Sequence, residues 1–388
     1  MAQGAVAGEE RAAAASRLIF IDNIRWVMIV LVITMHAAVT YSNLGRWYYN
    51  EKAPLSPGGR IFFIFWQTWL QSFFMGFLFF IAGYFVPGAF DRKGAGRFLR
   101  DRAVRLGIPT LLYMFVVGPL TIYYLLVRPE GILRSFPDWW LHYVTGPDIR
   151  GGGTGPLWFC AALLIFCAAY AAYRALRPSV PSSRPWLPGD RHVLFFAATM
   201  AAATWLVRIV QPMGTAIWNM QLCYFAQYIL LFAAGIHAYR HNWLTRVPRA
   251  LGLRWLVLVL TAGTVWFVGL LASALKFQWG DRIMGGLHWE SAVFAGWEQF
   301  FCVGVCLGLI VLFREHWNIQ PRTVRFLSDN AFAVYVFHPP VVIGAALALR
   351  SFHAPPVEKF CILSLIGIAV SFPLAAALRR VPVLRHVL

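Results

Sequence analysis

Charged side chains are scarce in this sequence. Only 13% of the 388 residues are Asp, Glu, Lys or Arg, against about 25% in an average soluble domain. Hydrophobic residues make up 59% of the chain, and 32 Phe and 17 Trp contribute to an aromatic fraction of 16%. A soluble fold of this size could not bury so much apolar surface and stay dispersed. The composition therefore excludes an ordinary soluble protein and indicates a chain that folds in lipid.

Acidic residues are the rarest of the charged ones. The 16 Asp and Glu against 34 Lys and Arg leave a net charge of +18. Such a charge is typical of nucleic-acid-binding proteins when the basic residues gather on one soluble face. Here they fall in short clusters between apolar runs, as in the loops of membrane proteins. Nucleic acid is therefore excluded as a partner.

Metal-binding and disulfide patterns are also missing. The six Cys lie inside apolar segments, form no C-x-x-C pair and have no His at metal-ligand spacing. We interpret them as small buried hydrophobic residues and expect no metal site. No Walker-type glycine-rich loop is present, so side chains would have to hold any bound nucleotide. No cleavable signal peptide is evident, and the first apolar run is expected to act as a signal-anchor.

The sequence does contain ten apolar stretches of about 20 residues, the length at which a helix crosses the hydrocarbon core. Only helices or closed barrels satisfy the backbone in lipid, and these runs are too long for barrel strands. They predict an all-α integral membrane protein, a single bundle of about ten transmembrane helices. Residues 1–17 are predicted to be a disordered tail, and 18–388 a single membrane domain. The predicted spans are approximately 19–41, 61–86, 105–127, 156–176, 192–211, 218–239, 253–275, 291–313, 326–350 and 359–379.

The distribution of Lys and Arg predicts the orientation of the chain. With the N-terminus in the cytoplasm, the cytoplasmic segments carry 22 of the 34 Lys and Arg, and the opposite side carries 11. This two-to-one bias favours a cytoplasmic N-terminus and a cytoplasmic C-terminus.

Three ionisable residues, Asp22, Arg25 and His36, lie within the first predicted span. Such groups are costly at membrane depth, so each is a functional candidate. At about 100° per residue they share one stripe of a helix, along which Arg25 and His36 are about 16 Å apart. An i,i+3 ion pair could be the whole role of Asp22 and Arg25. His36, kept mostly neutral by desolvation, could accept a proton as a general base does.

A basic cluster follows the second predicted span. It marks a cytoplasmic loop in any interpretation. Arg102 and Arg105 are three residues apart and share a helix face, where their guanidinium groups would suit phosphate. The cluster consists of Arg92, Lys93, Arg97, Arg100, Arg102 and Arg105.

Three further residues are weaker candidates. Glu298 lies near the outer end of its span, where a structural hydrogen bond and a catalytic role are both open. His338 precedes two prolines that would bend or loosen the helix, and it could form a second polar wall of a cavity. Trp158 lies where an aromatic-belt residue would lie in any case.

Five segments, in order along the chain, resemble the acyltransferase 3 family of bacterial membrane O-acyltransferases. Arg, ten residues and then His is a family signature, matched by Arg25 and His36, and Arg-x-x-Arg is matched by Arg102 and Arg105. The segments are FIDNIRWVMIVLVITMH (20–36), FFIAGYF (79–85), RAVR followed by LGIP (102–109), LWF (157–159) and AVYVFHPP (333–340).

Within that family the chain looks closest to the branch that modifies, and in one case succinylates, periplasmic glucans. The likeness includes HAAVTYS (36–42) and RRVPVLRHVL (379–388). The chain departs from many members by reading AGY (82–84) where they have Ser-Gly-Phe or Ser-Gly-Tyr.

The resemblance implies an O-acyltransferase of the bacterial inner membrane. Its donor substrate would be cytoplasmic acyl-CoA, with acetyl and succinyl both open, and no cofactor would be permanently bound. A hydroxyl of a periplasmic glucan or surface polysaccharide would lose its proton to His36. Asp22 would orient Arg25. The residues expected to bind the donor are Arg97, Arg102 and Arg105 with help from Arg25, and the supporting residues are Trp158, Glu298, Tyr335 and His338.

Two other functions are compatible with parts of the sequence. A transporter of a polar or lipid-linked sugar would use Asp22, Arg25 and His36 as a proton relay, but the sequence has neither an internal repeat nor pairs of Gly/Pro-broken helices. A membrane-bound O-acyltransferase of the other large family would depend on a late His, here His338. The sequence leaves the acyl group, the acceptor and the oligomeric state open.

Overall fold

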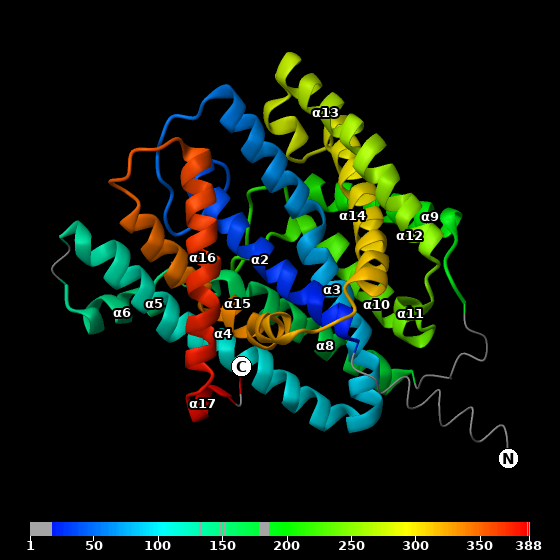
Figure 1. Cartoon of the computed structure of the whole chain (residues 1–388), viewed down its shortest axis with the longest axis horizontal. Coiled ribbons are helices and arrows are strands. Elements are labelled where there is room, and N and C mark those ends of the chain that lie inside the picture. Colours follow the sequence, from blue (N-terminus) through cyan, green and yellow to red (C-terminus); the bar gives the residue numbers. More distant parts are fainter. Residues whose placement is uncertain are drawn as a thin grey trace.

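The computed structural model describes residues 18–131, 134–147, 149, 153–177, 186–385 and 387. In these ranges every regular element longer than a single bridge is a helix. The all-α class is therefore confirmed, and Figure 1 shows the helices packed across one another. The predicted disordered tail, 1–17, lies outside the described residues.

Nine helices in the described part of the chain are long and apolar enough to cross a membrane. They agree with the predicted spans to within a few residues, except that two of the ten predicted spans fall in one helix. The nine are α2 (Ile19–Ser42), Pro57–Glu130 beginning with α3 (Pro57–Arg102), Gly155–Leu176 with α8 (Trp158–Leu176), α9 (Asp190–Val210), Leu222–Arg240 with α10 (Phe225–Arg240), Arg249–Lys276 with α12 (Arg249–Leu258) and α13 (Thr264–Lys276), α14 (Trp289–His316), α15 (Arg322–Ala348) and α16 (Pro356–Leu378).

The helix Pro57–Glu130 contains both 61–86 and 105–127. Its 74 residues are interrupted at Gly94, which has a φ of 70°. Glycine adopts this left-handed conformation without the steric cost of a Cβ, and the chain turns sharply in this part of Figure 1. After the turn, Pro109 and Pro119 each remove a backbone donor, and α-helical and π-helical turns alternate along 103–127. The stretch Pro57–Glu130 thus consists of two helical segments that meet at Gly94, and each of them holds one of the predicted spans.

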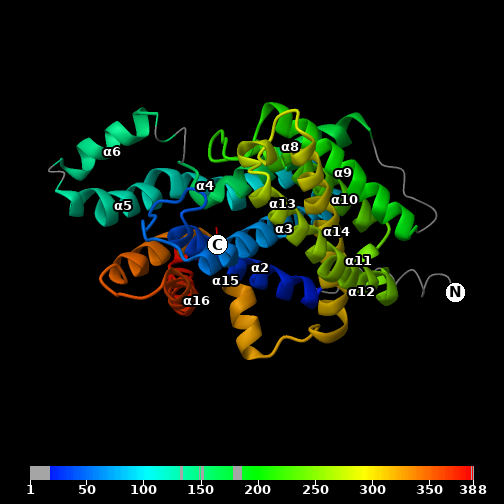
Figure 2. The same ribbon diagram turned by 90° about the horizontal axis from the view of Figure 1, so that it is seen from above.

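Helix α3 lies at the centre of the bundle and contacts α2, α8, α10 and α14. On one side of it α2, α15 and α16 pack against one another, and on the other α14 packs against α9 and α12. Figure 2 shows these two groups, with α4 (Ile108–Leu112), α5 (Gly118–Ile122) and α6 (Phe136–Thr145) extending beyond the first. This arrangement places the first helix, which carries the predicted site residues, against α15 near the other end of the sequence.

Two glycines allow α3 and α10 to approach closely. A Cβ added to Gly83 would lie 2.2 Å from the carbonyl oxygen of Phe232, and one added to Gly235 would lie 2.1 Å from that of Phe80. Small residues permit such backbone contact between helices in membranes, where lipid removes the hydrophobic drive for packing. The glycine of the AGY segment is therefore required by packing.

Candidate active site

A first cavity of about 540 Å³ lies between α2, α3, α8 and α15 at the end of the bundle where α2 begins. Asp22 and Arg25 line it, and Arg25 Nη1 lies 3.1 Å from Asp22 Oδ1. The predicted i,i+3 ion pair is therefore present. Arg102 and Arg105 also line this cavity. We call it the arginine cavity.

Arg379 is a fourth arginine of this cavity, and the sequence analysis did not select it. It comes from the end of α16, some 350 residues after Arg25, and its Nη1 lies 3.1 Å from Asn330 Oδ1. Among the described residues of its lining, four guanidinium groups accompany the Asp22 carboxylate, an excess of positive charge that suits an anion with several phosphate groups.

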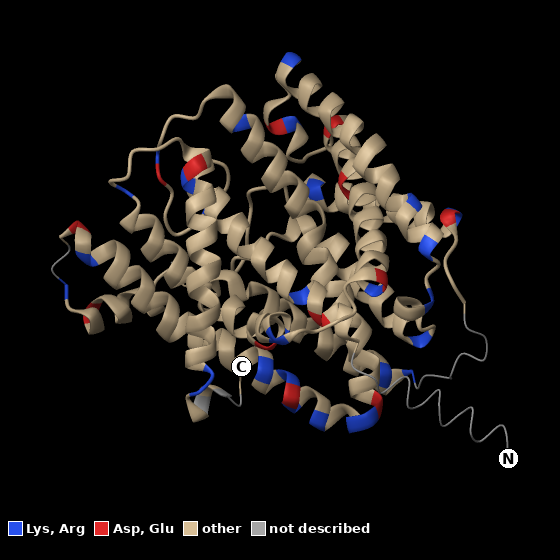
Figure 3. Cartoon of the chain, viewed as in Figure 1, with Lys and Arg blue, Asp and Glu red and all other residues tan. Residues whose placement is uncertain are grey.

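The rest of the predicted basic cluster lies elsewhere. Taken over the described residues, the lining of the arginine cavity does not include Arg97, which is exposed on the C-terminal segment of α3 around and after Gly94. Lys93 forms an ion pair with Asp101 in the same segment. Figure 3 shows Lys and Arg spread along this segment outside the bundle. Only Arg102 and Arg105 of the cluster therefore reach the cavity.

A second cavity, of about 440 Å³, lies further along α2. We call it the histidine cavity, because His36 lines it together with Trp158, Glu298 and Tyr335. The stripe predicted on the first helix is thus divided between two cavities, with Asp22 and Arg25 in one and His36 in the other.

The His36 ring is held in a stack of aromatic rings. It lies 3.7 Å from the Trp47 ring, with an angle of 14° between the planes, and 5.2 Å from the His338 ring at the same angle. The Trp47 and His338 centroids are themselves 6.4 Å apart, so Trp47 covers a face of the imidazole while His338 lies beside its edge. Packing on Trp47 therefore restricts the tilt of the His36 ring.

The loop 43–56 brings Trp47 to this position. Asn50 Nδ2 donates to the Val39 carbonyl at 2.8 Å, and the Glu51 carboxylate lies 2.6 Å from Lys359 Nζ on α16. Tyr113 donates to the Tyr48 hydroxyl at 3.1 Å, and burial raises the pKa of that hydroxyl well above its usual value. Tyr48 is therefore neutral at physiological pH, and three contacts tie the loop to the bundle.

His338 is fully buried behind His36, and it is not among the described residues that line either cavity. Its Nδ1 lies 2.9 Å from the Tyr335 carbonyl oxygen. That carbonyl would normally accept from residue 339, but Pro339 has no N–H to donate. A carbonyl can only accept, so Nδ1 carries the proton and Nε2 is left as an acceptor. Helix α15 continues through Pro339 and Pro340, and His338 replaces one of the two lost backbone donors.

Tyr335 separates the two cavities, since it lines both. Its hydroxyl donates to the Pro156 carbonyl at the start of the helical stretch that contains α8. In the predicted LWF segment, Trp158 lines the histidine cavity and Phe159 the arginine cavity. Tyr335 and these two neighbours therefore form the partition between the Arg25 side and the His36 side.

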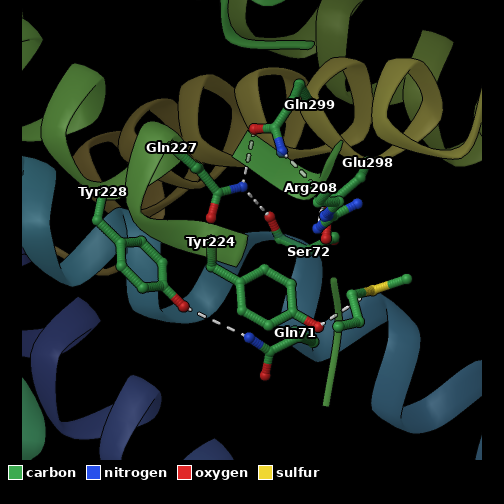
Figure 4. Close-up of polar contacts among 9 residues, drawn as sticks. Gln71, Ser72, Arg208, Tyr224, Gln227, Tyr228, Glu298 and Gln299 are labelled. Atoms are coloured by element: carbon green, nitrogen blue, oxygen red, sulfur yellow. Dashed lines mark hydrogen bonds and ion pairs between the residues drawn. The ribbon is translucent and has the colours of Figure 1, made fainter. Parts of the chain in front are cut away.

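Glu298 is buried and pairs with a residue that the sequence analysis did not select. Its Oε2 lies 2.7 Å from Arg208 Nη2 on α9, and the Arg208 side chain is 0% exposed. Figure 4 shows this pair within a larger group of polar side chains from α3, α9, α10 and α14. The available signal was a lone Arg three residues inside the end of an apolar run, which is unfavourable in a membrane unless it is paired.

Among the described residues, no group of three or more His, Cys, Asp or Glu is placed to hold a metal ion. All six Cys are free. Five are buried as predicted, and Cys361 is exposed on α16. The prediction of burial is therefore wrong for Cys361.

A helical membrane protein with an oriented imidazole in one cavity and a cluster of arginines in an adjoining one has the parts of a membrane-embedded group-transfer enzyme. The family model of the acyltransferase domain of type 3 matches residues 18–376. The chain therefore belongs to the acyltransferase 3 family and is a multi-pass membrane acyltransferase. Neither the comparison with curated proteins nor that with solved structures finds a match.

Proposed function

We propose that this enzyme moves an acyl group from cytoplasmic acyl-CoA to a hydroxyl of a carbohydrate on the other side of the membrane. The observation that carries the proposal is the pair of cavities that meet at Tyr335, one with four arginines and one with His36. The excess of Lys and Arg on the Arg25 side in turn favours a cytoplasmic location for the arginine cavity.

The donor would bind with its phosphates in the arginine cavity. Arg25, Arg102 and Arg105 supply guanidinium groups that can each hold a phosphate through two hydrogen bonds. From Arg25 to His36 is eleven residues, or about 16 Å of helix. An extended pantetheine arm would cover this distance, pass Tyr335 and carry the thioester to the His36 ring.

The chemistry would need only one base. His36 takes the proton from the acceptor hydroxyl as its oxygen attacks the thioester carbonyl. The carbon–sulfur bond then breaks, the thiolate leaves with the proton from His36, and the acceptor keeps the acyl group as an ester. Nothing in this cycle requires a metal, and His36 returns to its starting state.

The lining of the histidine cavity supports a carbohydrate acceptor. Amide side chains, which form hydrogen bonds with hydroxyl groups, stand there beside Trp158, whose face can pack on a sugar ring. The amide residues are Gln67, Gln71, Asn219 and Gln221. A periplasmic glucan or a surface polysaccharide is the class of acceptor, acetyl and succinyl are the candidate acyl groups, and the bacterial inner membrane is the location.

Reconstituted vesicles test this function directly. Radiolabelled acetyl-CoA or succinyl-CoA would be supplied on the face of the arginine cavity, with glucose oligosaccharides on the opposite face. We expect label to appear in the oligosaccharide as an alkali-labile ester. Absence of label with both donors and several oligosaccharides, or equal labelling when the donor is supplied only on the His36 face, would contradict the proposal.

Replacement of Arg102 or Arg105 by Gln is expected to raise the KM for acyl-CoA about tenfold each. A hydrogen bond to a charged group contributes roughly 1.5–3 kcal/mol, and each 1.4 kcal/mol is about a factor of ten. The rate at saturating donor should change little, because neither arginine reaches the thioester in this arrangement. Initial rates over a range of donor concentrations measure both constants.

Arg100→Gln is the matched control for these variants. Arg100 lies in the same segment but is exposed and outside the lining of the arginine cavity. Its KM for acyl-CoA should equal that of the unaltered enzyme. An equal rise in the KM for acyl-CoA in all three variants would mean that the overall positive charge attracts the donor and that Arg102 and Arg105 form no specific binding site.

A further inference from the structure

We infer that Glu298, held by Arg208, binds a second hydroxyl of the acceptor while His36 binds the one to be acylated. This inference rests on the proposed function and makes it narrower, because it restricts the acceptor to polyhydroxy compounds. It assigns the Arg208–Glu298 pair a role in choosing the substrate.

The first argument is where this ion pair lies. The Arg208 and Glu298 side chains are 0% and 3% exposed. Arg208 also lies over the rings of Tyr224 and Phe294, at 5.2 and 5.7 Å from their centroids. Removing two charges from water costs several kcal/mol per ion, and a buried pair repays this only with very good geometry. Packing alone would be served as well by apolar side chains of similar volume.

The geometry of the pair is incomplete in a specific way. Arginine and a carboxylate commonly form two parallel hydrogen bonds, one to each carboxylate oxygen. Here Arg208 and Gln299 both donate to the same oxygen of Glu298. Arg208 Nη2 lies 2.7 Å and Gln299 Nε2 3.0 Å from Glu298 Oε2. Glu298 Oε1 accepts no hydrogen bond from the residues that the structure describes. Glu298 lines the histidine cavity, and we assign this oxygen to a donor bound there.

A fixed network behind the carboxylate keeps it in this state. Gln227 Nε2 donates to Gln299 Oε1 at 3.0 Å and to the Ser72 carbonyl at 2.6 Å. The accepted bond defines the orientation of the Gln299 amide, which must then present its NH₂ group to Glu298. Figure 4 shows Gln299 between Gln227 and Glu298. The carboxylate is thus held on one oxygen only, and rotating it would break two hydrogen bonds.

The ligand chemistry follows from the two acceptors. Glu298 and His36 both line one cavity of about 440 Å³, and the acceptors assigned to them, Oε1 and an imidazole nitrogen, each need an O–H or N–H donor. This volume lies within the range of small-molecule sites. A sugar can offer one hydroxyl to each group, whereas an alcohol with one hydroxyl can satisfy only one of them. The pair therefore selects polyhydroxy acceptors such as glycosides.

Binding of methyl β-glucoside and its monodeoxy analogues to the purified protein tests this inference without requiring turnover. In the unaltered protein, the analogue that lacks the hydroxyl bound by Glu298 should bind about tenfold more weakly than the parent sugar. In Glu298→Gln the parent sugar should itself bind about tenfold more weakly, and this analogue should bind as well as the parent. Equal affinity of the variant and the unaltered protein for the parent sugar would overturn the inference.

Two further variants protect the experiment from a folding defect. Glu298→Gln leaves a buried guanidinium without its carboxylate, which can destabilise the fold. The double variant Arg208→Met/Glu298→Leu removes both charges and should fold, yet show the same loss of sugar affinity. Glu290→Gln is the matched control, since Glu290 lies on the same helix, is equally buried and pairs with Arg282 at 3.0 Å, but lines a different groove. Its sugar affinity should be unchanged.

Transfer of label in parallel separates this inference from the proposed function. If sugar binding depends on Glu298 but no acyl-CoA supports transfer, Glu298 does bind a second hydroxyl of the acceptor and acyl-CoA is the wrong donor. If transfer depends on His36 while Glu298→Gln and the double variant bind sugar normally, the proposed acyl transfer is supported and the role of Glu298 in binding a second hydroxyl is wrong.

Discussion

Replacement of His36 by Ala is expected to lower the rate of acyl transfer about 10³-fold. A positioned general base contributes roughly 10²–10⁴-fold to a reaction. The proposed base is the His36 imidazole, which packs at 3.7 Å on Trp47 and lines the cavity proposed for the acceptor. With a methyl group in its place, the described lining of the histidine cavity contains no imidazole, because His338 does not line it. The KM for acyl-CoA should stay close to its normal value, because the arginine cavity is unchanged.

The measurement is label transfer to oligosaccharide at matched amounts of inserted protein. His353→Ala is the matched control, since His353 is exposed in the loop between α15 and α16, and its rate should be normal. His338→Ala should lower the rate only about tenfold, because His338 supports the His36 ring and does not line the cavity. The opposite order, with His338 indispensable and His36 dispensable, would move the base to α15 and favour the mechanism of the other large family of membrane O-acyltransferases.

Most of the helical frame follows from hydropathy alone. A run of about 20 apolar residues has no other stable solution in lipid than a helix, so the predicted spans and the described helices agree. The stretch Pro57–Glu130 contains two of these spans, and the non-helical Gly94 separates them. Hydropathy locates both segments, but it contains no information on the turn that joins them.

The candidate site was predictable where it depends on one helix. Periodicity places Asp22, Arg25 and His36 on one stripe of α2, and two of them line one cavity while the third lines the next. The division between the cavities was not predictable, because it depends on Tyr335, about 300 residues further along the chain. Periodicity within a helix specifies a face, and only the packing of other helices specifies what that face meets.

Three residues of the site were missed for the same physical reason. Trp47 reaches His36 through a loop whose path depends on an ion pair with Lys359. Arg379 reaches the arginine cavity from the end of the last long helix. Arg208 is recognisable as a paired charge only when Glu298 is seen beside it. Each of these contacts joins segments far apart in sequence, and no local pattern of residues encodes such a contact.

Replacement of Gly83 by Ala is expected to destabilise the folded protein strongly. The new Cβ would lie 2.2 Å from the Phe232 carbonyl oxygen, 3.0 Å from its carbonyl carbon and 3.1 Å from its Cα. All three are backbone atoms of α10, so no side-chain rotation relieves the overlap, and α3 and α10 must separate along their contact. Overpacking a core costs about 1–3 kcal/mol even where side chains can adjust, and here we expect at least about 3 kcal/mol.

Thermal unfolding in detergent, followed by size-exclusion elution, measures this effect. Gly235→Ala should behave alike, because its Cβ would meet the Phe80 carbonyl oxygen from the other helix. Gly344→Ala on α15 is the matched control. A Cβ there has no neighbour within 4 Å, and alanine favours a helix over glycine by up to about 1 kcal/mol, so stability should be equal or higher. A Gly83→Ala protein that elutes and unfolds like the unaltered one would contradict the close approach of α3 and α10.

The same geometry distinguishes the two small residues of the AGY segment. Ala82 already carries a Cβ and lines the arginine cavity, whereas Gly83 faces the backbone of α10. Ala82→Ser should therefore fold normally, and its added hydroxyl would enter the cavity assigned to the donor. If Ala82→Ser has an altered KM for acyl-CoA and an unaltered unfolding temperature, position 82 affects donor binding and position 83 affects folding. A fall in stability at both positions would instead mean that the whole segment serves packing.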